Sequence, residues 1–507
     1  MNSMATRGVI AAAAVAALAA PTPAFAPTAG AARDPSRAEA LQQAVTLDGT
    51  LRHLRALQRI ADVNGGDRLA GTSGHSASAG YVAGQLTAAG YDVTYQPFEF
   101  PFFQENSPST LARTAPSPKT YAPREDFVTM AFSGSGDVSA PVQEVDLTLP
   151  PSPTPSSTSG CEAADFAGFT SGNIALIQRG TCTFEQKVDN AVTAGAAGVI
   201  VFNEGQPGRT AAFGGRMDSA KTIPVLSASF DVGNELSARG TRVRMTTDTT
   251  NSTRTTYNVL AETRNGRADN VVMSGAHLDS VDAGPGINDN GSGSAAQLEV
   301  AIQLAKVVKN PRNKVRFAWW SAEEEGLLGS THYVADATTA ELGDIALVLN
   351  FDMLASPNFA RFVYDGDDSD HVGEGPGPEG SAAIEKVLQD FYAARNLPTE
   401  GTDFSGRSDY GPFLAAGIPA GGIFSGAEGV KTAAQAAKWG GRAGTAYDRC
   451  YHQACDTTRN INNTALDQNA DAVAFAVATF ANSTSQVNGR ARRPGANALM
   501  PRLVYGR

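Results

Sequence analysis

The residues best suited to metal chemistry gather in one glycine-rich stretch of the chain, residues 275–293. His277 is followed two residues later by Asp279 and twelve residues later by Asp289, and small residues surround all three. Imidazole nitrogens and carboxylate oxygens are ligands that zinc takes in proteins. A single histidine is more often structural than a ligand, so the interpretation depends on further ligands elsewhere in the chain.

Further carboxylates follow two other segments that read as strands. Residues 315–320 and 345–351 are short apolar runs typical of buried strands, and acidic residues come soon after each. Open α/β sheets form their sites beyond the carboxyl ends of their strands, so we expect these side chains to converge at one edge of a sheet. The residues that would meet there, with a second histidine from further along the chain, are His277, Asp289, Glu323, Glu324, Asp352 and His452.

This set of residue types suits a hydrolase with two zinc ions. Two metal ions about 3.5–4 Å apart form a clamp, and a bridging carboxylate is a natural way to hold them there. Five ligands, one of them bridging, would leave room for a shared water, as a catalytic zinc site requires. The glutamates at 323–325 could instead be acidic residues in the first turn of a helix, stabilised by the helix dipole. The presence of Asp352 and His277 among the converging residues favours a role as metal ligands.

The elements around these residues indicate an α/β fold. The apolar run at 270–274 reads as a buried strand that leads into the glycine-rich stretch, and 294–308 has apolar residues at helical spacing. Further helices are predicted at 51–63, 76–89, 383–395 and 466–480, and further strands at 91–98 and 419–424.

A second unit of different amino-acid composition lies before the glycine-rich stretch. Residues 103–125 and 149–160 are rich in proline, serine and threonine, which is typical of linkers or long surface loops. A βαβ-like unit without a ligand cluster follows, and we interpret it as an accessory module of ordinary domain size. It comprises strands at 174–177, 199–202 and 223–226 and a helix at 183–194.

The N-terminus and the cysteines indicate a secreted protein. A basic residue, an apolar alanine-rich run and small residues give residues 1–31 the pattern of a signal peptide. That run is too short to span a membrane, and no other stretch approaches the roughly 20 apolar residues that a span needs. The four cysteines are an even number, which suits an oxidising compartment. Sequence proximity favours two disulfides, Cys161–Cys182 and Cys450–Cys455, among the pairings available.

Composition and missing motifs argue against several other functions. A net charge of −11 over 507 residues, without a basic stripe, argues against a nucleic-acid partner. Neither Gly-x-Ser-x-Gly nor His-Glu-x-x-His occurs, which argues against the common serine hydrolases and single-zinc proteases. We expect a disordered basic tail at 486–507 and a solvated acidic loop at 365–370, for which a weak calcium site is the alternative.

Five motifs resemble those of the secreted di-zinc aminopeptidases of the bacterial leucyl aminopeptidase type. They are Gly-Ala-His-Leu-Asp-Ser at 275–280, Gly-Ile-Asn-Asp-Asn-Gly-Ser-Gly at 286–293, Trp-Ser-Ala-Glu-Glu at 320–324, Asn-Phe-Asp-Met at 350–353 and Cys-Tyr-His-Gln at 450–453. The resemblance covers residues 257–485 and implies the zinc-dependent exopeptidase fold, an α/β fold with a mixed, mostly parallel sheet flanked by helices. It also implies a cis peptide bond between Asp289 and Asn290.

The same resemblance implies a role for each polar residue of these motifs. Glu323 would be the general base that takes a proton from the metal-bound water, and Tyr451 would donate to the oxyanion of the tetrahedral intermediate. Asp279 would orient His277, because zinc-binding histidines need such a partner. The ligands of two zinc ions per chain would be the bridging Asp289 together with His277, Glu324, Asp352 and His452.

Three further residues are assigned to substrate binding on the same grounds. Arg407 looks like the family's arginine near the substrate, and Met353 and Phe424 look like walls of the side-chain pocket. The family commonly has a leucine or similar residue where this chain has Glu325, which leaves open which of the neighbouring glutamates is the base and which is the ligand.

The accessory module is similar to a protease-associated (PA) domain. The likeness rests on Arg-Gly-Thr-Cys-Thr-Phe at 179–184, on Lys187 and on Ala-Gly-Ala-Ala-Gly-Val at 194–199. We place this inserted domain at 136–249, so that residues 40–135 and 250–485 form a discontinuous catalytic domain.

The expected activity is that of a secreted, monomeric aminopeptidase acting on peptides with a free, apolar N-terminal residue. A carboxypeptidase or glutaminyl cyclase of the same fold is the alternative enzyme, although a carboxypeptidase needs basic residues for the substrate carboxylate and Arg407 is the obvious candidate. A receptor-like binding protein is the alternative outside catalysis, and the intact ligand positions and Glu323 argue against it.

Overall fold

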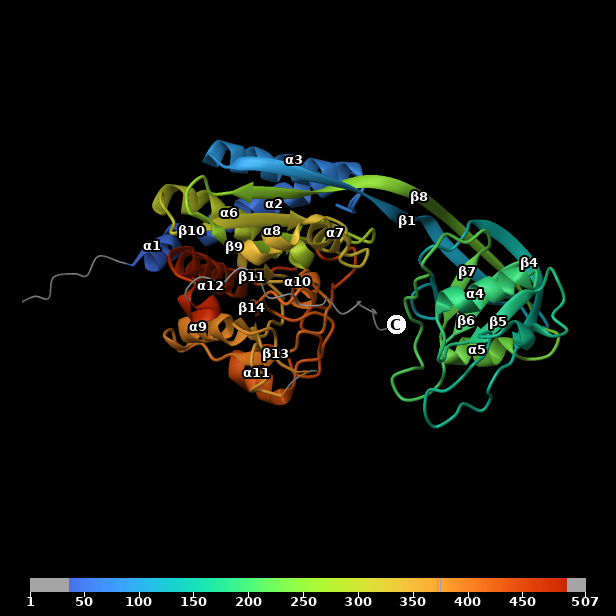
Figure 1. Ribbon diagram of the computed structural model, residues 1–507. Helices are drawn as coiled ribbons and strands as arrows, with labels where there is room; N and C mark the ends of the chain where they lie inside the picture. The colour runs from blue at the N-terminus through green and yellow to red at the C-terminus, as the bar shows by residue number, and fades with distance from the viewer. Residues whose placement is uncertain (1–35, 372, 374, 490–507) are drawn as a thin grey trace, which may run out of the picture. The chain divides into compact units, whose positions relative to one another are not determined.

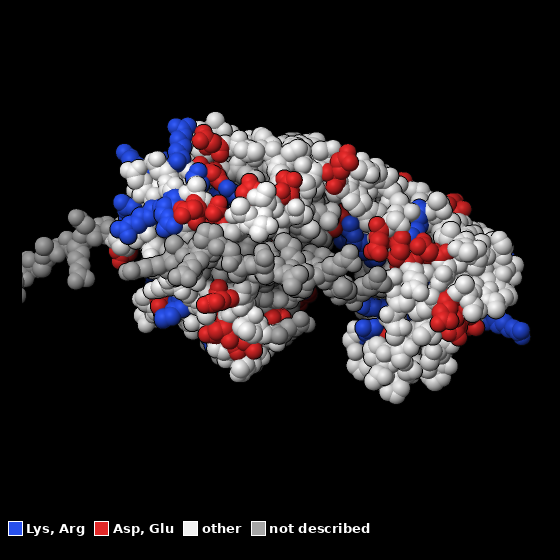
Figure 2. All heavy atoms as spheres, viewed as in Figure 1, with Lys and Arg blue, Asp and Glu red and all other residues white. Residues whose placement is uncertain are grey.

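The computed structural model describes residues 36–371, 373 and 375–489 (Figure 1). The predicted signal peptide at 1–31 and residues 490–507 of the predicted basic tail lie outside the described residues. Residues 486–488 of that tail belong to a short helix, so the prediction of disorder is wrong for them. Within the described part of the chain, none of the helices has the length and apolar character needed to cross a membrane. On the face drawn in Figure 2, acidic and basic side chains occur in small interspersed groups.

The regions that were predicted to hold metal lie in one part of a mixed 14-stranded sheet. In this part the strand order is β13-β12-β14-β11-β9-β10-β8, with β1 also paired to β8. The neighbours β10, β9, β11 and β14 run parallel, whereas β1, β8 and β12 pair with neighbouring strands in the antiparallel sense. This confirms the predicted fold. The strands are β1 (Asp92–Ala115), β8 (Arg242–Glu262), β9 (Arg267–His277), β10 (Asn313–Trp320), β11 (Ile345–Phe351), β12 (Phe362–Tyr364), β13 (Glu400–Thr402) and β14 (Ala420–Phe424).

Helices cover both faces of this sheet because its central strands are apolar on both sides. On β9, Val272 packs into one hydrophobic cluster and its neighbour Met273 into another, as the alternation of side chains along a strand requires. Parallel strands buried on both faces read as continuous apolar runs, which is why they could be identified in the sequence. The helices are α1 (Arg37–Ala44), α2 (Leu47–Val63), α3 (Ser73–Ala89), α6 (Gly293–Val307), α7 (Leu328–Asp336), α8 (Thr339–Asp344), α9 (Ser381–Ala393), α10 (Gly411–Ala415), α11 (Ala433–Trp439), α12 (Asn463–Asn482) and α13 (Ser485–Asn488).

The strands of the accessory module continue this sheet, because β4 pairs with β8 in the antiparallel sense, from Gly136 opposite Thr247 to Pro141 opposite Arg242. Strands β4, β5, β6 and β7 are parallel, and β3 pairs with β7 in the antiparallel sense. The predicted βαβ-like unit is confirmed, although its third strand begins two residues later than predicted, after Pro224. The elements are β2 (Lys119–Thr120), β3 (Phe127–Thr129), β4 (Gly136–Val145), β5 (Ile174–Gln178), β6 (Gly198–Phe202), β7 (Val225–Ala228), α4 (Phe184–Thr193) and α5 (Phe230–Leu236), with a short 3₁₀ helix at Ala163–Phe166.

The prediction of a linker or surface loop at 103–125 is wrong for its first half. Strand β1 continues to Ala115, and it pairs with β8 throughout, from Asp92 opposite Glu262 to Ala115 opposite Arg242. Proline is tolerated at the edges and irregularities of sheets, where the missing N–H donor is not needed. Register shifts occur in this segment between Ser107 and Thr110, around Pro108, so the strand accommodates that proline.

Candidate metal centre

Three adjacent strands place their polar residues at one edge of the sheet. Strand β9 lies between β10 and β11 and ends at His277. Glu323 and Glu324 follow the end of β10, and Asp352 follows the end of β11. The three strands are parallel, so their carboxyl ends meet at this edge, as the sequence predicted.

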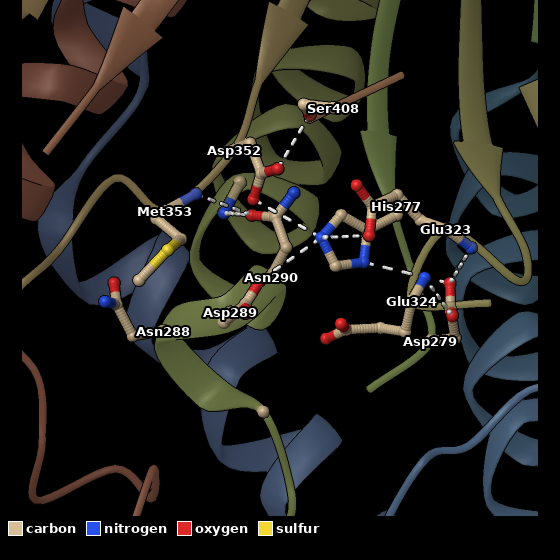
Figure 3. Close-up of polar contacts among 12 residues, drawn as sticks. His277, Asp279, Asn288, Asp289, Asn290, Glu323, Glu324, Asp352, Met353 and Ser408 are labelled. Carbon is tan, nitrogen blue, oxygen red and sulfur yellow. Dashed lines mark hydrogen bonds and ion pairs between the residues drawn. The ribbon is translucent and has the colours of Figure 1, made fainter. Parts of the chain in front are cut away.

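The remaining ligand-type residues come from two loops. Asp289 lies in the buried turn Ile287–Ser292, which leads directly into α6. His452 lies in the loop closed by the Cys450–Cys455 disulfide. Figure 3 shows the side chains of His277, Asp289 and Asp352 directed toward one another.

The distances among these side chains outline two adjoining positions for a cation. The two oxygens of Asp289 face different histidines: Oδ1 lies 3.3 Å from Nε2 of His277 and Oδ2 lies 3.2 Å from Nε2 of His452. Asp352 Oδ1 is 3.3 Å from Nε2 of His277, and Glu324 Oε2 is 3.0 Å from Nε2 of His452. Two atoms bound to one tetrahedral zinc at about 2.0–2.1 Å lie about 3.3–3.4 Å apart. The three distances of 3.2–3.3 Å are close to this value, and the Glu324–His452 distance is shorter.

Several atoms of this cluster are buried and have no hydrogen-bond partner among the described residues. They are both ring nitrogens of His277, Oε1 of Glu324 and Oδ1 of Asp352. Buried polar atoms normally have partners, because leaving one unpaired costs about 1–3 kcal/mol. A bound cation would satisfy the carboxylate oxygens and Nε2 of His277, the ring nitrogen that faces Asp289 and Asp352, so the residues present fit a metal.

Electrostatics also favour positive charge at this position. Burial would lower the pKa of His452, but Glu324 and Asp289 outweigh it and raise that pKa to about 11. Burial would likewise lower the pKa of His277, and Glu323 and Asp352 raise it well above its ordinary value. Burial raises the pKa of Glu324 to about 7, helped by the neighbouring charge of Asp289.

Glu323 differs from Glu324 in its distance from the histidines. Its Oε2 lies 3.9 Å from Nε2 of His277, farther than the carboxylates of Asp289 and Asp352. Glu323 is within 4.8 Å of both His277 and Asp352 and is therefore a conceivable ligand, but its separation from His277 exceeds that of two atoms on one tetrahedral zinc. Burial raises the pKa of Glu323 well above its ordinary value.

The next residue, Glu325, is turned to a different partner. Its Oε2 accepts a hydrogen bond of 2.7 Å from Arg216.

Asp279 holds the glutamate loop rather than the histidine. Its two oxygens accept hydrogen bonds of 3.3 Å from the backbone N–H groups of Glu323 and Glu324. Its Oδ1 lies 3.8 Å from Nδ1 of His277, beyond hydrogen-bond distance. The role of Asp279 in orienting His277 therefore stays a prediction, and the hydrogen bonds that Asp279 accepts here come from the backbone of both glutamates.

A cavity of about 100 Å³ opens beside the cluster. Met353 and Phe424, the residues predicted to form the side-chain pocket, are among those that line it. Tyr451 also lines it, and its ring stacks on that of His452 at a centroid distance of 3.8 Å. Arg407 donates from Nη2 to the Tyr451 hydroxyl at 3.2 Å and from Nη1 to Glu428 at 2.7 Å. The remaining lining includes Tyr364, Thr402, Asp403, Ser405, Ser408, Tyr410 and Ala427.

Sequence reasoning missed several residues that support the cluster. Asp456 accepts hydrogen bonds from the backbone N–H groups of Asn288 and Asp289, so it holds the turn that carries the shared carboxylate. Ser408 donates to Asp352 Oδ2 at 2.7 Å. Asp409 is buried nearby, and burial raises its pKa to about 7. Asp456 could have been found from its position beside Cys455, in the loop of His452. No feature of the sequence pointed to Ser408 or Asp409.

Three covalent predictions are confirmed. The disulfides join Cys161 to Cys182 and Cys450 to Cys455. The peptide bond between Asp289 and Asn290 is cis.

The acidic loop at 365–370 binds its own backbone. Asp365 accepts hydrogen bonds from the N–H groups of Ser369 and Asp370, and Glu385 accepts one from Gly366. Carboxylate oxygens of Asp365, Asp367 and Glu385 lie within 4.8 Å of one another. The calcium site remains a prediction.

Comparison with known proteins agrees with this geometry. Residues 258–477 match the model of peptidase family M28, and residues 142–236 match that of the PA domain. An aminopeptidase of Pseudomonas aeruginosa is 48% identical over 464 residues, which cover 90% of this chain and 85% of that protein. A probable lipoprotein aminopeptidase of Mycobacterium tuberculosis is 41% identical and covers 89% of this chain and 88% of its own length.

Solved structures give the same assignment of fold. The aminopeptidase from Aneurinibacillus sp. strain AM-1 matches with a TM-score of 0.66 at 25% identity, over 92% of this chain and 98% of that one. A zinc aminopeptidase from Bacillus subtilis matches with a TM-score of 0.61 at 23% identity, over 87% of this chain and 98% of that one. The chain therefore belongs to peptidase family M28, as an aminopeptidase that carries an inserted PA domain.

Proposed function

We propose that this aminopeptidase is a secreted enzyme with two zinc ions, which releases apolar N-terminal residues from peptides. One position would be held by His277 and Asp352 and the other by His452 and Glu324, with Asp289 shared between them. The single observation that carries the proposal is that the two oxygens of Asp289 face different histidines at 3.3 and 3.2 Å.

Zinc, when bound, supplies a Lewis acid that makes water acidic near neutral pH and polarises a carbonyl oxygen. Glu323 then accepts the proton of the attacking water at its carboxylate and later returns it to the leaving amine. Its distance of 3.9 Å from His277, longer than those of Asp289 and Asp352, supports this role over that of a ligand. Asp279 fixes the backbone of both glutamates, so the base and the ligand keep their relative positions.

Tyr451 is the donor we assign to the oxyanion of the tetrahedral intermediate. Its stacking on His452 keeps its ring beside the cluster, and Arg407 holds the hydroxyl from the other side. The acidic groups of the site hold the substrate's α-amine, and Met353 and Phe424 line the cavity for its apolar side chain.

The contacts of Arg407 do not favour a carboxypeptidase. A carboxypeptidase needs a cation for the substrate's terminal carboxylate, but the Arg407 guanidinium is already hydrogen-bonded to Glu428 and Tyr451. The proposal includes a discontinuous catalytic domain, residues 40–135 and 250–485, around a PA domain at 136–249. The two disulfides and the signal-like N-terminus support secretion.

A pair of substrates tests the proposed activity. The protein should hydrolyse leucine p-nitroanilide but not N-acetyl-leucine p-nitroanilide, because the acetyl group removes the charged α-amine. A peptide with a blocked N-terminus and a free C-terminus should remain intact. Cleavage of that peptide would support the carboxypeptidase, and equal hydrolysis of both anilides would contradict an enzyme that requires a free N-terminus.

A further inference from the structure

Arg68 is an arginine without solvent exposure beside the metal centre. It lies in the loop between α2 and α3 and is 0% exposed. Arginine is almost never fully buried unless its charge is paired. Within the described part of the chain, no carboxylate lies within ion-pair distance of Arg68, so its burial needs another explanation.

The Arg68 guanidinium donates all of its hydrogen bonds described here to backbone carbonyls. Nε donates to Pro285 at 2.8 Å, Nη2 to Gly286 at 2.6 Å, and Nη1 to Leu278. The planar guanidinium presents its donors in a fixed fork, so these three contacts define the relative positions of the carbonyls. The main chain of Arg68 adds a reciprocal pair with Ser280, one bond to its hydroxyl and one from its N–H.

The three carbonyls lie at the two ends of one loop, residues 278–286, which joins the end of β9 to the turn that carries Asp289. Leu278 lies between His277 and Asp279, at the end of β9. Pro285 and Gly286 lie directly before the turn that carries Asp289. One side chain therefore holds the two ends of this loop together, one end next to His277 and the other next to the turn of Asp289.

The C-terminal end of this loop has a backbone conformation that admits the contact. Gly286 has φ = +55°, and a Cβ atom there would lie 2.2 Å from the carbonyl oxygen of Asp289 and 3.3 Å from Nη2 of Arg68. A larger residue could not occupy this position while the guanidinium and the turn stay where they are.

Charge also suits Arg68 to this place. Burial lowers its pKa to about 10, and the nearby carboxylates of Asp279, Asp456 and Asp289 limit the fall. Arg68 is thus charged at neutral pH and contributes a fixed positive charge among acidic residues.

We propose that Arg68 is a positioning residue, which holds the end of β9 at His277 and the turn of Asp289 in the relative positions that these two ligands need to bind metal. The inference rests on the proposed function, because it concerns the same metal centre. Residues that position metal ligands without touching the metal typically change metal affinity by about 10–100-fold when they are replaced.

The test compares zinc binding by the full-length wild type, Arg68→Lys, Arg68→Met and the control Arg361→Met. Arg361 is also a buried arginine, but it donates to Gln468 and contacts none of the candidate ligands in the described structure. Each metal-free protein is checked for folding by circular dichroism and thermal melting, then titrated with zinc against a chromophoric chelator. Hydrolysis of leucine p-nitroanilide gives kcat and KM in parallel.

We expect folded Arg68→Met to bind zinc about 10–100-fold more weakly than wild type and to lose more in kcat than in KM. Arg68→Lys keeps the positive charge but loses the planar set of guanidinium donors, and should also bind zinc more weakly. Arg361→Met should match the wild type in zinc affinity.

Wild-type zinc affinity in both Arg68 variants would overturn the proposal. If Arg68→Met does not fold, Arg68→Lys decides. If neither folds while Arg361→Met does, Arg68 serves the stability of the fold and the proposal is also overturned. Zinc bound by the wild type without aminopeptidase activity would contradict the proposed function instead, since the Arg68 comparison depends only on relative zinc affinity.

Discussion

Buried charged groups have different surroundings in the metal centre and in the PA domain. In the PA domain, Lys221 donates to Glu185 and Asp189 at 2.6 Å each. Glu204 accepts from two backbone N–H groups and pairs with Arg209. In the metal centre, by contrast, ring nitrogens of His277 and oxygens of Glu324 and Asp352 have no hydrogen-bond partner in the described structure.

The difference separates structural charges from functional ones. Buried charged groups that are hydrogen-bonded to one another stabilise a fold, so removing one of them should lower the free energy of unfolding. Charges left without partners remain costly until a ligand arrives, so they indicate a site. Substitutions in the two regions should therefore affect different measurements, and the following predictions test this separation from the largest expected effect to the smallest.

Glu323→Gln should have the largest effect on activity. We expect kcat to fall by about 10²–10⁴-fold, the usual contribution of a general base, with zinc content and melting temperature unchanged. Glu325→Gln is the matched control, because the Glu325 carboxylate pairs with Arg216 and not with the metal cluster. Loss of zinc from Glu323→Gln would mean that the base and the ligand have been exchanged.

Tyr451→Phe removes only a hydroxyl group from the wall of the cavity. The expected result is a fall in kcat of about 10²-fold, typical of the loss of one oxyanion donor, with a smaller change in KM. Steady-state kinetics on leucine p-nitroanilide measure both constants. An unchanged kcat would remove Tyr451 from the chemistry and leave it a role in supporting His452.

Asp279→Asn changes one acceptor into a donor beside two backbone N–H groups. Since Asp279 accepts from the amides of Glu323 and Glu324, we expect about a tenfold or greater loss of zinc affinity or activity. Asp137→Asn is a control at an exposed pair with Arg244 in the PA domain and should change neither quantity. Equal behaviour of the two variants would contradict the positioning role.

Lys221→Met should affect stability and leave catalysis unchanged. Loss of its hydrogen bonds to Glu185 and Asp189 should lower the free energy of unfolding by about 1–3 kcal/mol. Thermal or urea unfolding measures this change, and kcat on leucine p-nitroanilide should remain that of the wild type. A large fall in kcat at unchanged stability would show that the PA domain takes part in the reaction.

The same variant has a predictable pH dependence. Burial would raise the pKa of Glu185, but hydrogen bonds from Lys221 and Ser219 outweigh it and lower this pKa below its ordinary value of 4.5. A carboxyl group with a lowered folded-state pKa stabilises the fold above its unfolded pKa, and the contribution disappears as the pH falls through the folded value. The stability difference between wild type and Lys221→Met should therefore be full at pH 7 and shrink below pH 4.5. A difference that grows in acid would contradict this assignment.

The sequence was most informative where local pattern and chemistry coincide. Each candidate ligand on β9, β10 and β11 follows an apolar run at the end of a parallel strand, so its position could be predicted. Strand β1 was missed beyond residue 98 because its prolines and serines are typical of loops. The alternation of Phe98, Phe100 and Phe102, all buried, was the signal that could have extended it.

The supporting contacts could not be predicted because they join distant parts of the chain. Arg68 reaches carbonyls more than 200 residues away, and Asp456 holds backbone N–H groups at Asn288 and Asp289. Backbone groups look alike in any sequence, so a side chain that binds them leaves no local pattern. The ligands of the site are thus readable from residue type, whereas the residues that position them require the fold.

The measurement that tests the central claim most directly is the number of zinc ions that the metal-free protein binds per chain. Calorimetric titration of the apoprotein, with aminopeptidase activity followed in parallel, should give two zinc ions per chain and restored activity. Asp289→Ala should lose both high-affinity sites, because its carboxylate is the one shared between them. One zinc ion per chain, or full occupancy in Asp289→Ala, would contradict the bridged pair, and no binding at all would remove the metal from the account.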